Sequence, residues 1–262
     1  MNIQELLVTG TRLLKEKEIP TPRLDSEVLL ANRLSKDRVY FLSHGDERVL
    51  PEVERSFLQD IQRRSRLEPV AYITGKKEFM GLELEVDPHV LIPRPDTEIL
   101  VEAAMDMLKE KTGFVHVLDI GTGSGAIAIS LTRYLPQVKV TAVDIDPHAL
   151  KTAKKNADKM GVADRIQFVW SDCFQNVEGI FDAIVSNPPY IDREEMKGLD
   201  ANVVEFEPVK ALYGGEDGLD FYREIARQAP GHLKKGGSSS LRSGVPRPRR
   251  SEGSWKKSVL DP

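Results

Sequence analysis

The sequence contains a single cysteine, Cys173, among its 262 residues. One cysteine forms no disulfide within the chain, and the first ten residues lack the basic start and apolar run of a secretory signal. No uninterrupted apolar stretch approaches the roughly 20 residues that a membrane helix needs. These absences argue against a disulfide-rich secreted domain and against a membrane protein, and they predict a cytoplasmic protein.

An excess of basic residues is also missing, because the formal net charge is -4. Nucleic-acid binders usually carry such an excess, so we expect no direct contact with nucleic acid. No helical histidine pair, cysteine cluster or Ser/His/Asp constellation stands out, which leaves metal and hydrolytic chemistry without support. The composition is that of an ordinary globular protein, 40% hydrophobic and 30% charged, which is apolar enough to form a core.

The first hundred residues divide into two parts by the spacing of their apolar residues. In residues 1–75 apolar residues recur at helical spacing, and Thr21-Pro22 is typical of a helix start, so we expect a small helical domain. Residues 76–98 are expected to link it to the rest as a β-hairpin. There, near-alternating apolar residues are interrupted by Asp87-Pro88 before a second apolar run at 90–92.

The third part, residues 99–237, begins with a predicted helix and continues with alternating strand and helix patterns. Such alternation is typical of βαβ units around a parallel sheet, so the fold class is α/β with a Rossmann-like sheet. In these sheets ligands bind beyond the carboxyl ends of the strands. The expected strands are residues 115–120, 138–145, 166–170 and 181–186, and the expected helices include residues 99–108 and 149–160.

The first expected strand ends in a glycine-rich turn that leads into a helix. Its residues are Gly121, Thr122, Gly123, Ser124 and Gly125. Glycines at such a turn let the backbone pass close to a ligand because no Cβ stands in the way. The spacing by itself is ambiguous, since it also satisfies the dinucleotide fingerprint, and a turn of this kind is often only a tight connection.

Acidic residues at successive strand ends favour S-adenosylmethionine over a dinucleotide. Asp119, two residues before the first glycine, can attract the ammonium group of that cofactor but would repel a pyrophosphate. Asp144 follows the second strand, where an acid accepts hydrogen bonds from ribose hydroxyls of either cofactor. Asp172 follows the third strand and is a candidate acceptor for the adenine amino group. Asp146, followed by proline and a helical stretch, is predicted to be a helix N-cap.

The fourth expected strand leads directly into Asn187, Pro188, Pro189 and Tyr190. Two prolines fix the backbone and remove two amide donors, so the loop offers acceptors to a substrate NH2 group. We expect the Asn187 side-chain oxygen and the Pro188 carbonyl to accept the two hydrogens of an amide and so orient its nitrogen for methyl transfer. Tyr190 is expected to pack against the planar group. An Asn-Pro turn alone is often only a turn.

Up to about Gly237 the chain resembles the release-factor glutamine methyltransferase family, often called HemK. The motifs that carry the resemblance are residues 69–75, 78–79, 90–95, 97–98, 119–125 and 186–190. The Asn-Pro-Pro-Tyr motif alone is shared with enzymes that methylate the amino group of adenine in nucleic acid. The Ile-Pro-Arg-Pro segment and the helical N-terminal part favour protein glutamine.

The resemblance implies a class I S-adenosylmethionine methyltransferase that acts on the glutamine in the Gly-Gly-Gln loop of class 1 peptide chain release factors. It also implies that the helical domain docks this protein substrate. We further expect the enzyme to be a monomer. The residues implied to bind the cofactor are Asp119, Gly121, Thr122, Gly123, Ser124, Gly125, Asp144, Asp172, Cys173 and Asn187. Three alternatives remain open: an adenine amino-methyltransferase, a glutamine methyltransferase of a ribosomal protein, and a nicotinamide-dependent oxidoreductase.

The last part, residues 238–262, departs from the family, whose members continue with an apolar strand and a further hairpin. Here serines are followed by a segment rich in proline and arginine, and no core strand can be recognised. A reading-frame slip near the Gly236-Gly237 codons would explain the change, and a genuine disordered basic tail with weak RNA affinity is the alternative. We therefore expect missing C-terminal strands, an exposed edge at residues 181–186, and lower stability and activity than a full-length relative.

Overall fold

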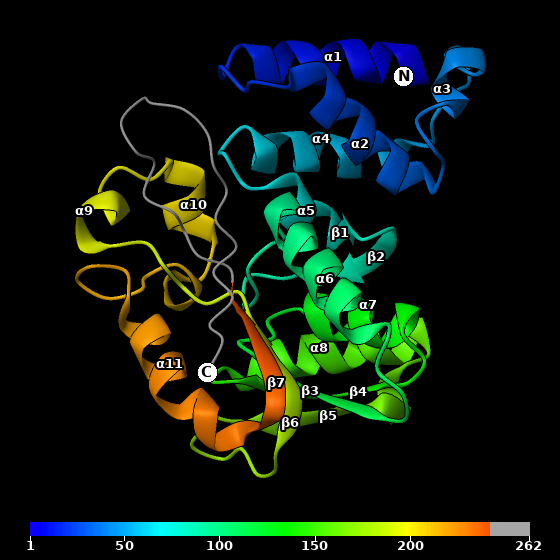
Figure 1. Cartoon of the computed structure of the whole chain (residues 1–262). Coiled ribbons are helices and arrows are strands. Elements are labelled where there is room, and N and C mark those ends of the chain that lie inside the picture. The colour runs from blue at the N-terminus through cyan, green and yellow to red at the C-terminus, as the bar shows by residue number, and fades with distance from the viewer. Residues whose placement is uncertain (242–262) are drawn as a thin grey trace, which may run out of the picture. The chain divides into compact units, whose positions relative to one another are not determined.

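The computed structural model describes residues 1–241, which form two compact units (Figure 1). Unit 1 comprises Met1–Lys76 and Asp200–Phe206. Unit 2 comprises, among the described residues, Lys77–Leu199 and 207–241. The chain thus leaves unit 1 after Lys76 and returns to it briefly before Glu207. None of the helices in the described residues is both long and apolar enough to span a bilayer.

Unit 1 is helical, as its apolar periodicity predicts. Its core is built from one apolar stripe of each long helix, with Leu6, Leu29 and Phe57 fully buried. The first helix begins with a capping box between Asn2 and Glu5, and the second begins at Pro22 after Thr21, as predicted. The helices are α1 (Ile3–Lys15), α2 (Pro22–Leu34), α3 (Tyr40–Ser43), α4 (Pro51–Arg64), α5 (Val70–Thr74) and α10 (Ala201–Phe206).

Unit 2 contains a parallel five-stranded sheet in the order β5-β4-β3-β6-β7. The expected α/β class is confirmed, and the four predicted strands are present, with β4 ending one residue earlier than expected. The strands are β3 (Val115–Ile120), β4 (Val138–Asp144), β5 (Ile166–Trp170), β6 (Phe181–Ser186) and β7 (Leu233–Leu241). The helical elements are α6 (Pro95–Leu108), α7 (Ala126–Tyr134), α8 (Pro147–Met160), η1 (Ala163–Arg165), α9 (Arg193–Met196), η2 (Val209–Ala211) and α11 (Asp220–His232).

Both faces of the sheet are covered. Helices α6, α7 and α8 lie on one face and α11 lies on the other (Figure 1). Successive residues of one strand point to opposite faces of the sheet and therefore pack in different hydrophobic clusters, as Val117 and Leu118 of β3 do. A strand buried on both sides reads as a continuous apolar run, which is why these strands were recognisable in the sequence.

The expectation that the sheet lacks a strand beside β6 is wrong. Strand β7 pairs in parallel with β6, from Ala183 opposite Ser238 to Ser186 opposite Leu241. Strand pairing uses backbone N–H and C=O groups, which serine supplies as well as an apolar residue, so the loss of an apolar pattern did not mean the loss of a strand. Strand β6 is consequently flanked by β3 and β7 and is not an exposed edge. Residues 242–262, with the further hairpin and the proposed basic tail, lie outside the described residues.

The predicted hairpin is present, but its strands and turn differ from the expectation. It consists of β1 (Lys76–Phe79) and β2 (Leu82–Glu85), joined by Met80 and Gly81. Both turn residues have positive φ, +52° and +70°, as the tight turns favoured in β-hairpins require. Asp87-Pro88 therefore follows the hairpin instead of forming its turn, and residues 90–92 are not a strand.

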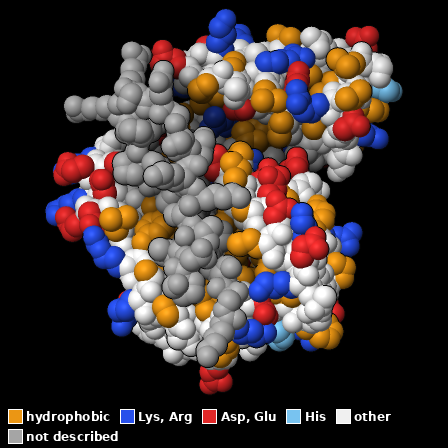
Figure 2. All heavy atoms as spheres, in the orientation of Figure 1, with side chains coloured by type: hydrophobic (Ala, Val, Ile, Leu, Met, Phe, Trp, Pro, Cys, Tyr) orange, Lys and Arg blue, Asp and Glu red, His pale blue; other side chains and the backbone are white. Residues whose placement is uncertain are grey.

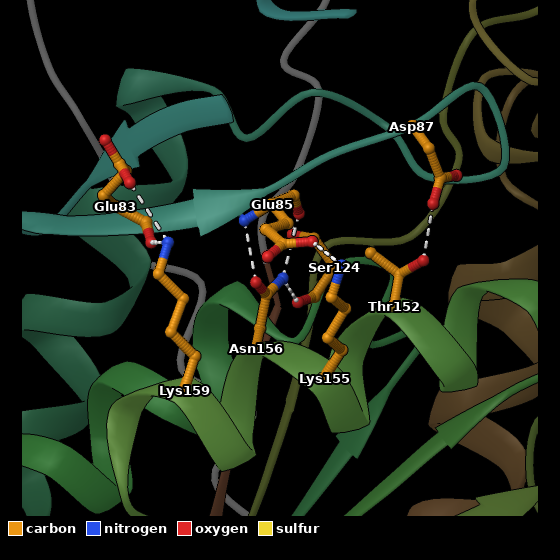
Figure 3. A network of polar contacts seen from close by, with 8 residues as sticks. All are labelled: Glu83, Glu85, Asp87, Ser124, Thr152, Lys155, Asn156 and Lys159. Carbon is orange, nitrogen blue, oxygen red and sulfur yellow. Dashed lines mark hydrogen bonds and ion pairs between the residues drawn. The ribbon is translucent and has the colours of Figure 1, made fainter. Parts of the chain in front are cut away.

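Polar contacts hold the hairpin strand β2 against α8 (Figure 3). The fully buried Asn156 donates from Nδ2 to the carbonyls of Glu85 and Ser124, both at 2.9 Å, and accepts from the Glu85 amide at 2.7 Å. At the same helix, Lys159 pairs with Glu83 near the surface. Because Ser124 belongs to the glycine-rich turn, Asn156 connects that turn to the hairpin.

Candidate active site

A pocket of about 570 Å³ lies at the carboxyl ends of the strands in unit 2. The strand order reverses between β3 and β6, since β4 and β5 extend the sheet on one side and β7 on the other. Ile120, the last residue of β3, pairs with Ser186, the last residue of β6, and the Ser186 hydroxyl donates to the Ile120 carbonyl at 2.7 Å. The glycine-rich turn and the Asn-Pro-Pro-Tyr loop therefore begin side by side, at the point where open α/β sheets bind ligands.

The glycines of the turn serve two purposes. Gly121 and Gly123 line the pocket with φ of +71° and +56°, and a Cβ added to either would meet nothing within 4 Å. Glycine is required at both positions because their positive φ is strained for other residues, and the space above them is open to a ligand. At Gly125, with φ +82°, an added Cβ would lie 2.9 Å from Ile129 Cδ1 and 3.1 Å from Ala153 Cβ. Gly125 therefore permits close packing of α7 on α8 and stands behind the pocket wall.

Asp119 lies beneath the glycine-rich turn, fully buried at 0% exposure. Its Oδ2 accepts a hydrogen bond from the Thr122 hydroxyl at 2.7 Å, while Oδ1 has no hydrogen-bond partner among the described residues. Burial raises the pKa of this carboxyl group to about 7. A buried carboxylate oxygen without a donor is costly, and a cationic or N–H-bearing ligand next to it would remove that cost.

Two further acids stand at the ends of the neighbouring strands, as predicted. The Asp144 carboxylate accepts from the Gly123 amide at 2.8 Å and from the Asp146 amide at 3.0 Å, and burial raises its pKa. Asp172 and Cys173 also line the pocket, and burial raises the pKa of the Cys173 thiol to about 11. Asp146 accepts from the His148 amide at 2.8 Å and caps α8, which confirms its predicted structural role.

Asn187, Pro188 and Pro189 line the same pocket directly after β6. The Asn187 side chain donates from Nδ2 to the Thr97 hydroxyl at 3.2 Å, and Thr97 is buried in the first turn of α6. This bond fixes the side-chain amide at its nitrogen end. Thr97 falls in a sequence motif of the family, but nothing in the sequence indicated that it contacts Asn187, ninety positions away.

Tyr190 is not among the residues that line the pocket, and its backbone is held by a glycine-rich loop that the sequence reasoning missed. An added Cβ at Gly214 would lie 2.8 Å from the Tyr190 Cα, and one at Gly218 would collide with the Tyr190 carbonyl oxygen. Ile191 then donates to the Leu212 carbonyl at 3.0 Å. The spacing of glycines in residues 214–218 was the available signal for this close approach of two backbones.

An ion pair stands at another part of the pocket wall. Arg94, which lines the pocket, donates from its guanidinium to Glu207 Oε1 at 2.6 Å, and the Glu207 side chain is only 2% exposed. The other oxygen of Glu207 has no partner in the described part of the chain. The two residues are 113 positions apart, so sequence spacing gave no sign of the pair.

The hydrogen-bond acceptors and the open backbone surface at the pocket suit S-adenosylmethionine. Asp144 and Asp172, which line the pocket, suit its hydroxyl and amino groups, and the bare glycine backbone suits close approach of its methionine part. Asp119 does not line the pocket and lies buried beneath the turn, where its unpartnered oxygen suits an ammonium group that approaches the turn. A volume of about 570 Å³ falls in the range of cofactor pockets. Among the residues described, no group of three or more His, Cys, Asp or Glu side chains is placed to hold a metal ion.

Comparison with known proteins matches both units. A family described as "PrmC N-terminal domain" matches residues 5–75, and one described as "Methyltransferase small domain" matches residues 96–206. The release factor glutamine methyltransferase of Moorella thermoacetica is 42% identical over 93% of this chain and 86% of its own length. That of Clostridium acetobutylicum is 40% identical over 90% and 84%. Among solved structures, the hMettl16 catalytic domain has a TM-score of 0.51 at 19% identity, over 73% of this chain and 67% of that one.

The parallel sheet, the glycine-rich turn and the methyltransferase match define the class: the chain is an S-adenosylmethionine-dependent methyltransferase with the class I fold. Within that class, the family follows from the sequence identity with these relatives, which extends over most of this chain and most of theirs. The chain belongs to the release factor glutamine methyltransferase family.

Proposed function

We propose that this chain transfers a methyl group from S-adenosylmethionine to the side-chain amide nitrogen of the glutamine in the Gly-Gly-Gln loop of class 1 peptide chain release factors. The observation that carries the proposal is the position of Asn187-Pro188 in the pocket, one strand from the glycine-rich turn, in a chain of this family. The proposal includes a cytoplasmic location, where release factors meet the ribosome.

The reacting nitrogen of an amide is a poor nucleophile because its lone pair is delocalised into the carbonyl group. In the proposed complex the Asn187 side-chain oxygen and the Pro188 carbonyl accept its two hydrogens, which fixes its orientation and increases the electron density on nitrogen. Proline provides no amide N–H at positions 188 and 189, so no backbone donor of these residues competes for the substrate. Packing of Tyr190 against the amide plane stays a prediction, because Tyr190 is not among the residues that line the pocket.

S-adenosylmethionine, when bound, supplies an electrophilic methyl group on a sulfonium sulfur. The chain's own contribution to holding it is proposed to come from the strand ends. Asp119 Oδ1 would accept a hydrogen bond from the ammonium group where that group approaches the glycine-rich turn. Asp144 would accept hydrogen bonds from the ribose hydroxyls, and Asp172 and Cys173 would face the adenine. The work of the protein is then positioning and electrostatics, with no strong base required.

The protein substrate is larger than the pocket, and we propose that unit 1 supplies the additional docking surface. Where described side chains are visible in Figure 2, Lys and Arg are interspersed with Asp and Glu. A mixed surface of this kind suits a protein partner better than a nucleic acid, whose phosphates dominate affinity. This favours glutamine over the adenine amino group, which an Asn-Pro-Pro-Tyr loop also accommodates.

The proposal is tested by incubating the purified chain with methyl-labelled S-adenosylmethionine and a class 1 release factor. The matched control is the same release factor with its loop glutamine replaced by alanine, and parallel reactions contain a ribosomal-protein mixture or adenine-containing nucleic acid. Label on the intact release factor alone is expected. Equal label on both release factors, or label only on ribosomal protein or nucleic acid, would contradict the glutamine assignment.

A further inference from the structure

The side chain of Thr97 stands behind the amide group that is expected to hold the substrate. Thr97 is 4% exposed, and its hydroxyl oxygen accepts the hydrogen bond from Asn187 Nδ2 at 3.2 Å. Threonine is branched at Cβ and has few accessible rotamers, so a buried threonine presents its hydroxyl in a fixed place. The Asn187 amide therefore has one of its two ends defined by a rigid partner.

The two ends of an asparagine amide have nearly the same shape but opposite hydrogen-bonding character. The oxygen accepts and the NH2 group donates, so a half-turn about the last bond of the side chain replaces an acceptor by two donors. A substrate amide nitrogen also bears two hydrogens, and a donor facing them would repel the substrate. The orientation of Asn187 thus decides whether the loop can bind the reacting nitrogen at all.

The helical turn that carries Thr97 is itself anchored. The Thr97 amide donates to the Arg94 carbonyl at 2.9 Å, and the Arg94 guanidinium is held by the buried Glu207 at 2.6 Å. Prolines at 93 and 95 fix the backbone on both sides of Arg94. A buried carboxylate cannot lose its cationic partner without a large cost, so the ion pair restricts the turn to one place.

We propose that Thr97 is a positioning residue for methyl transfer, which holds the Asn187 amide with its oxygen toward the substrate nitrogen, and that the Arg94–Glu207 ion pair fixes the turn that carries Thr97. This inference rests on the proposed function, since it names what orients the acceptor in that same reaction. Thr97 itself need not touch the substrate. Its effect passes through Asn187.

The proposal predicts a specific kinetic pattern. Thr97→Val keeps the shape of the side chain and removes the acceptor, so the Asn187 amide loses the contact that holds its nitrogen end and kcat falls roughly tenfold to a hundredfold, as for a misplaced catalytic contact. The KM for the release factor changes less than threefold, because most of the docking surface is untouched. Thr97→Ser restores the hydroxyl and recovers most of kcat relative to Thr97→Val. A purely structural role of Thr97 would instead lower the melting temperature of both variants and leave kcat of the folded enzyme unchanged.

Glu207→Gln tests the second part of the proposal. It loosens Arg94 while keeping the volume of the side chain, and it is expected to lower kcat severalfold with little change in KM. Because both substitutions act on the orientation of Asn187, the double variant Thr97→Val/Glu207→Gln should lose less than the product of the two single losses. Fully multiplicative losses in a folded double variant would show that Glu207 acts independently of Thr97.

An NMR measurement without methyl transfer tests the orientation of Asn187 separately from the proposed function. In the 15N-labelled chain, the side-chain NH2 signals of Asn187 are identified by their disappearance in Asn187→Asp. We expect these signals to move in Thr97→Val and to stay near their original position in Thr97→Ser. Unchanged signals in Thr97→Val would overturn the inference even if the enzyme methylates release factors. Shifted signals without any methylation of a release factor would support the orientation while refuting the proposed function.

Discussion

Removal of the Asn156 side chain is expected to destabilise unit 2 strongly. Asn156 is fully buried in α8 and satisfies three backbone groups, the amide and carbonyl of Glu85 and the carbonyl of Ser124 (Figure 3). In Asn156→Ala no other side chain replaces these contacts. Both the hairpin and the glycine-rich turn lose the residue that joins them.

The expected loss of unfolding free energy follows from the number of backbone groups that Asn156→Ala leaves without a hydrogen-bond partner. A buried donor or acceptor that loses its only partner costs about 1–3 kcal/mol. Glu85 is only half-buried and water can satisfy part of its loss, so we take about 1–2 kcal/mol for each of the three groups, or about 3–6 kcal/mol in total. A typical domain is stable by about 5–15 kcal/mol, so the variant would be close to unfolding at moderate temperature.

Thermal unfolding and chemical denaturation followed by circular dichroism measure this loss. The expected drop in melting temperature is on the order of 10 °C for a unit of this size. Lys159→Ala is the matched control, because it removes a contact between the same helix and hairpin, but one whose side chains are 36% and 51% exposed. The control should lose less than about 1 kcal/mol. If the two variants unfold at the same temperature, Asn156 does not connect the turn to the hairpin in the way described.

Three further predictions concern residues that stand behind or beside the pocket lining. Gly125→Ala places a methyl group against Ala153 at a positive φ and should lower both the melting temperature and the affinity for S-adenosylmethionine, measured by calorimetry. Gly218→Ala forces the backbone of Tyr190 away and should lower kcat at least tenfold with a small change in cofactor affinity, which steady-state kinetics will show. Asp119 has a pKa raised to about 7 by burial, so the folded chain binds its proton more tightly than the unfolded chain, and this contribution to stability is lost as the pH rises from about 4 through about 7. Because the ionised form is the one that attracts an ammonium group, affinity for the cofactor should rise about fivefold from pH 6 to pH 7, below the range in which an α-amino group itself loses its proton, and Asp119→Asn should remove that rise.

Much of the sheet and the main parts of the pocket could be predicted from the sequence. Strands buried on both faces give unbroken apolar runs, and residues that follow such strands meet at one edge of a parallel sheet. Asp144, Asp172 and Asn187 were therefore expected near the glycine-rich turn, and they line one pocket with it. Their assigned contacts with cofactor and substrate stay predictions.

The remaining features depend on contacts between distant residues or on backbone geometry. The Arg94–Glu207 pair and the bond from Asn187 to Thr97 join segments about a hundred positions apart, and single polar residues carry no periodicity that would reveal them. The sequence places the hairpin turn wrongly, because Asp87-Pro88 is a stronger turn signal than Met80-Gly81, where the turn lies. Strand β7 was missed because its apolar pattern is replaced by serines, while its pairing needs only backbone groups. The expected loss of stability and activity relative to full-length relatives stays a prediction.

The most direct test of the central claim is to locate the transferred methyl group on the protein substrate. A class 1 release factor is incubated with S-adenosylmethionine and either this chain or its Asn187→Ala variant, digested, and sequenced by tandem mass spectrometry. One methyl group is expected on the side-chain nitrogen of the glutamine in the Gly-Gly-Gln loop, and almost none with the variant. A methyl group on another residue, or equal methylation by the variant, would contradict the central claim.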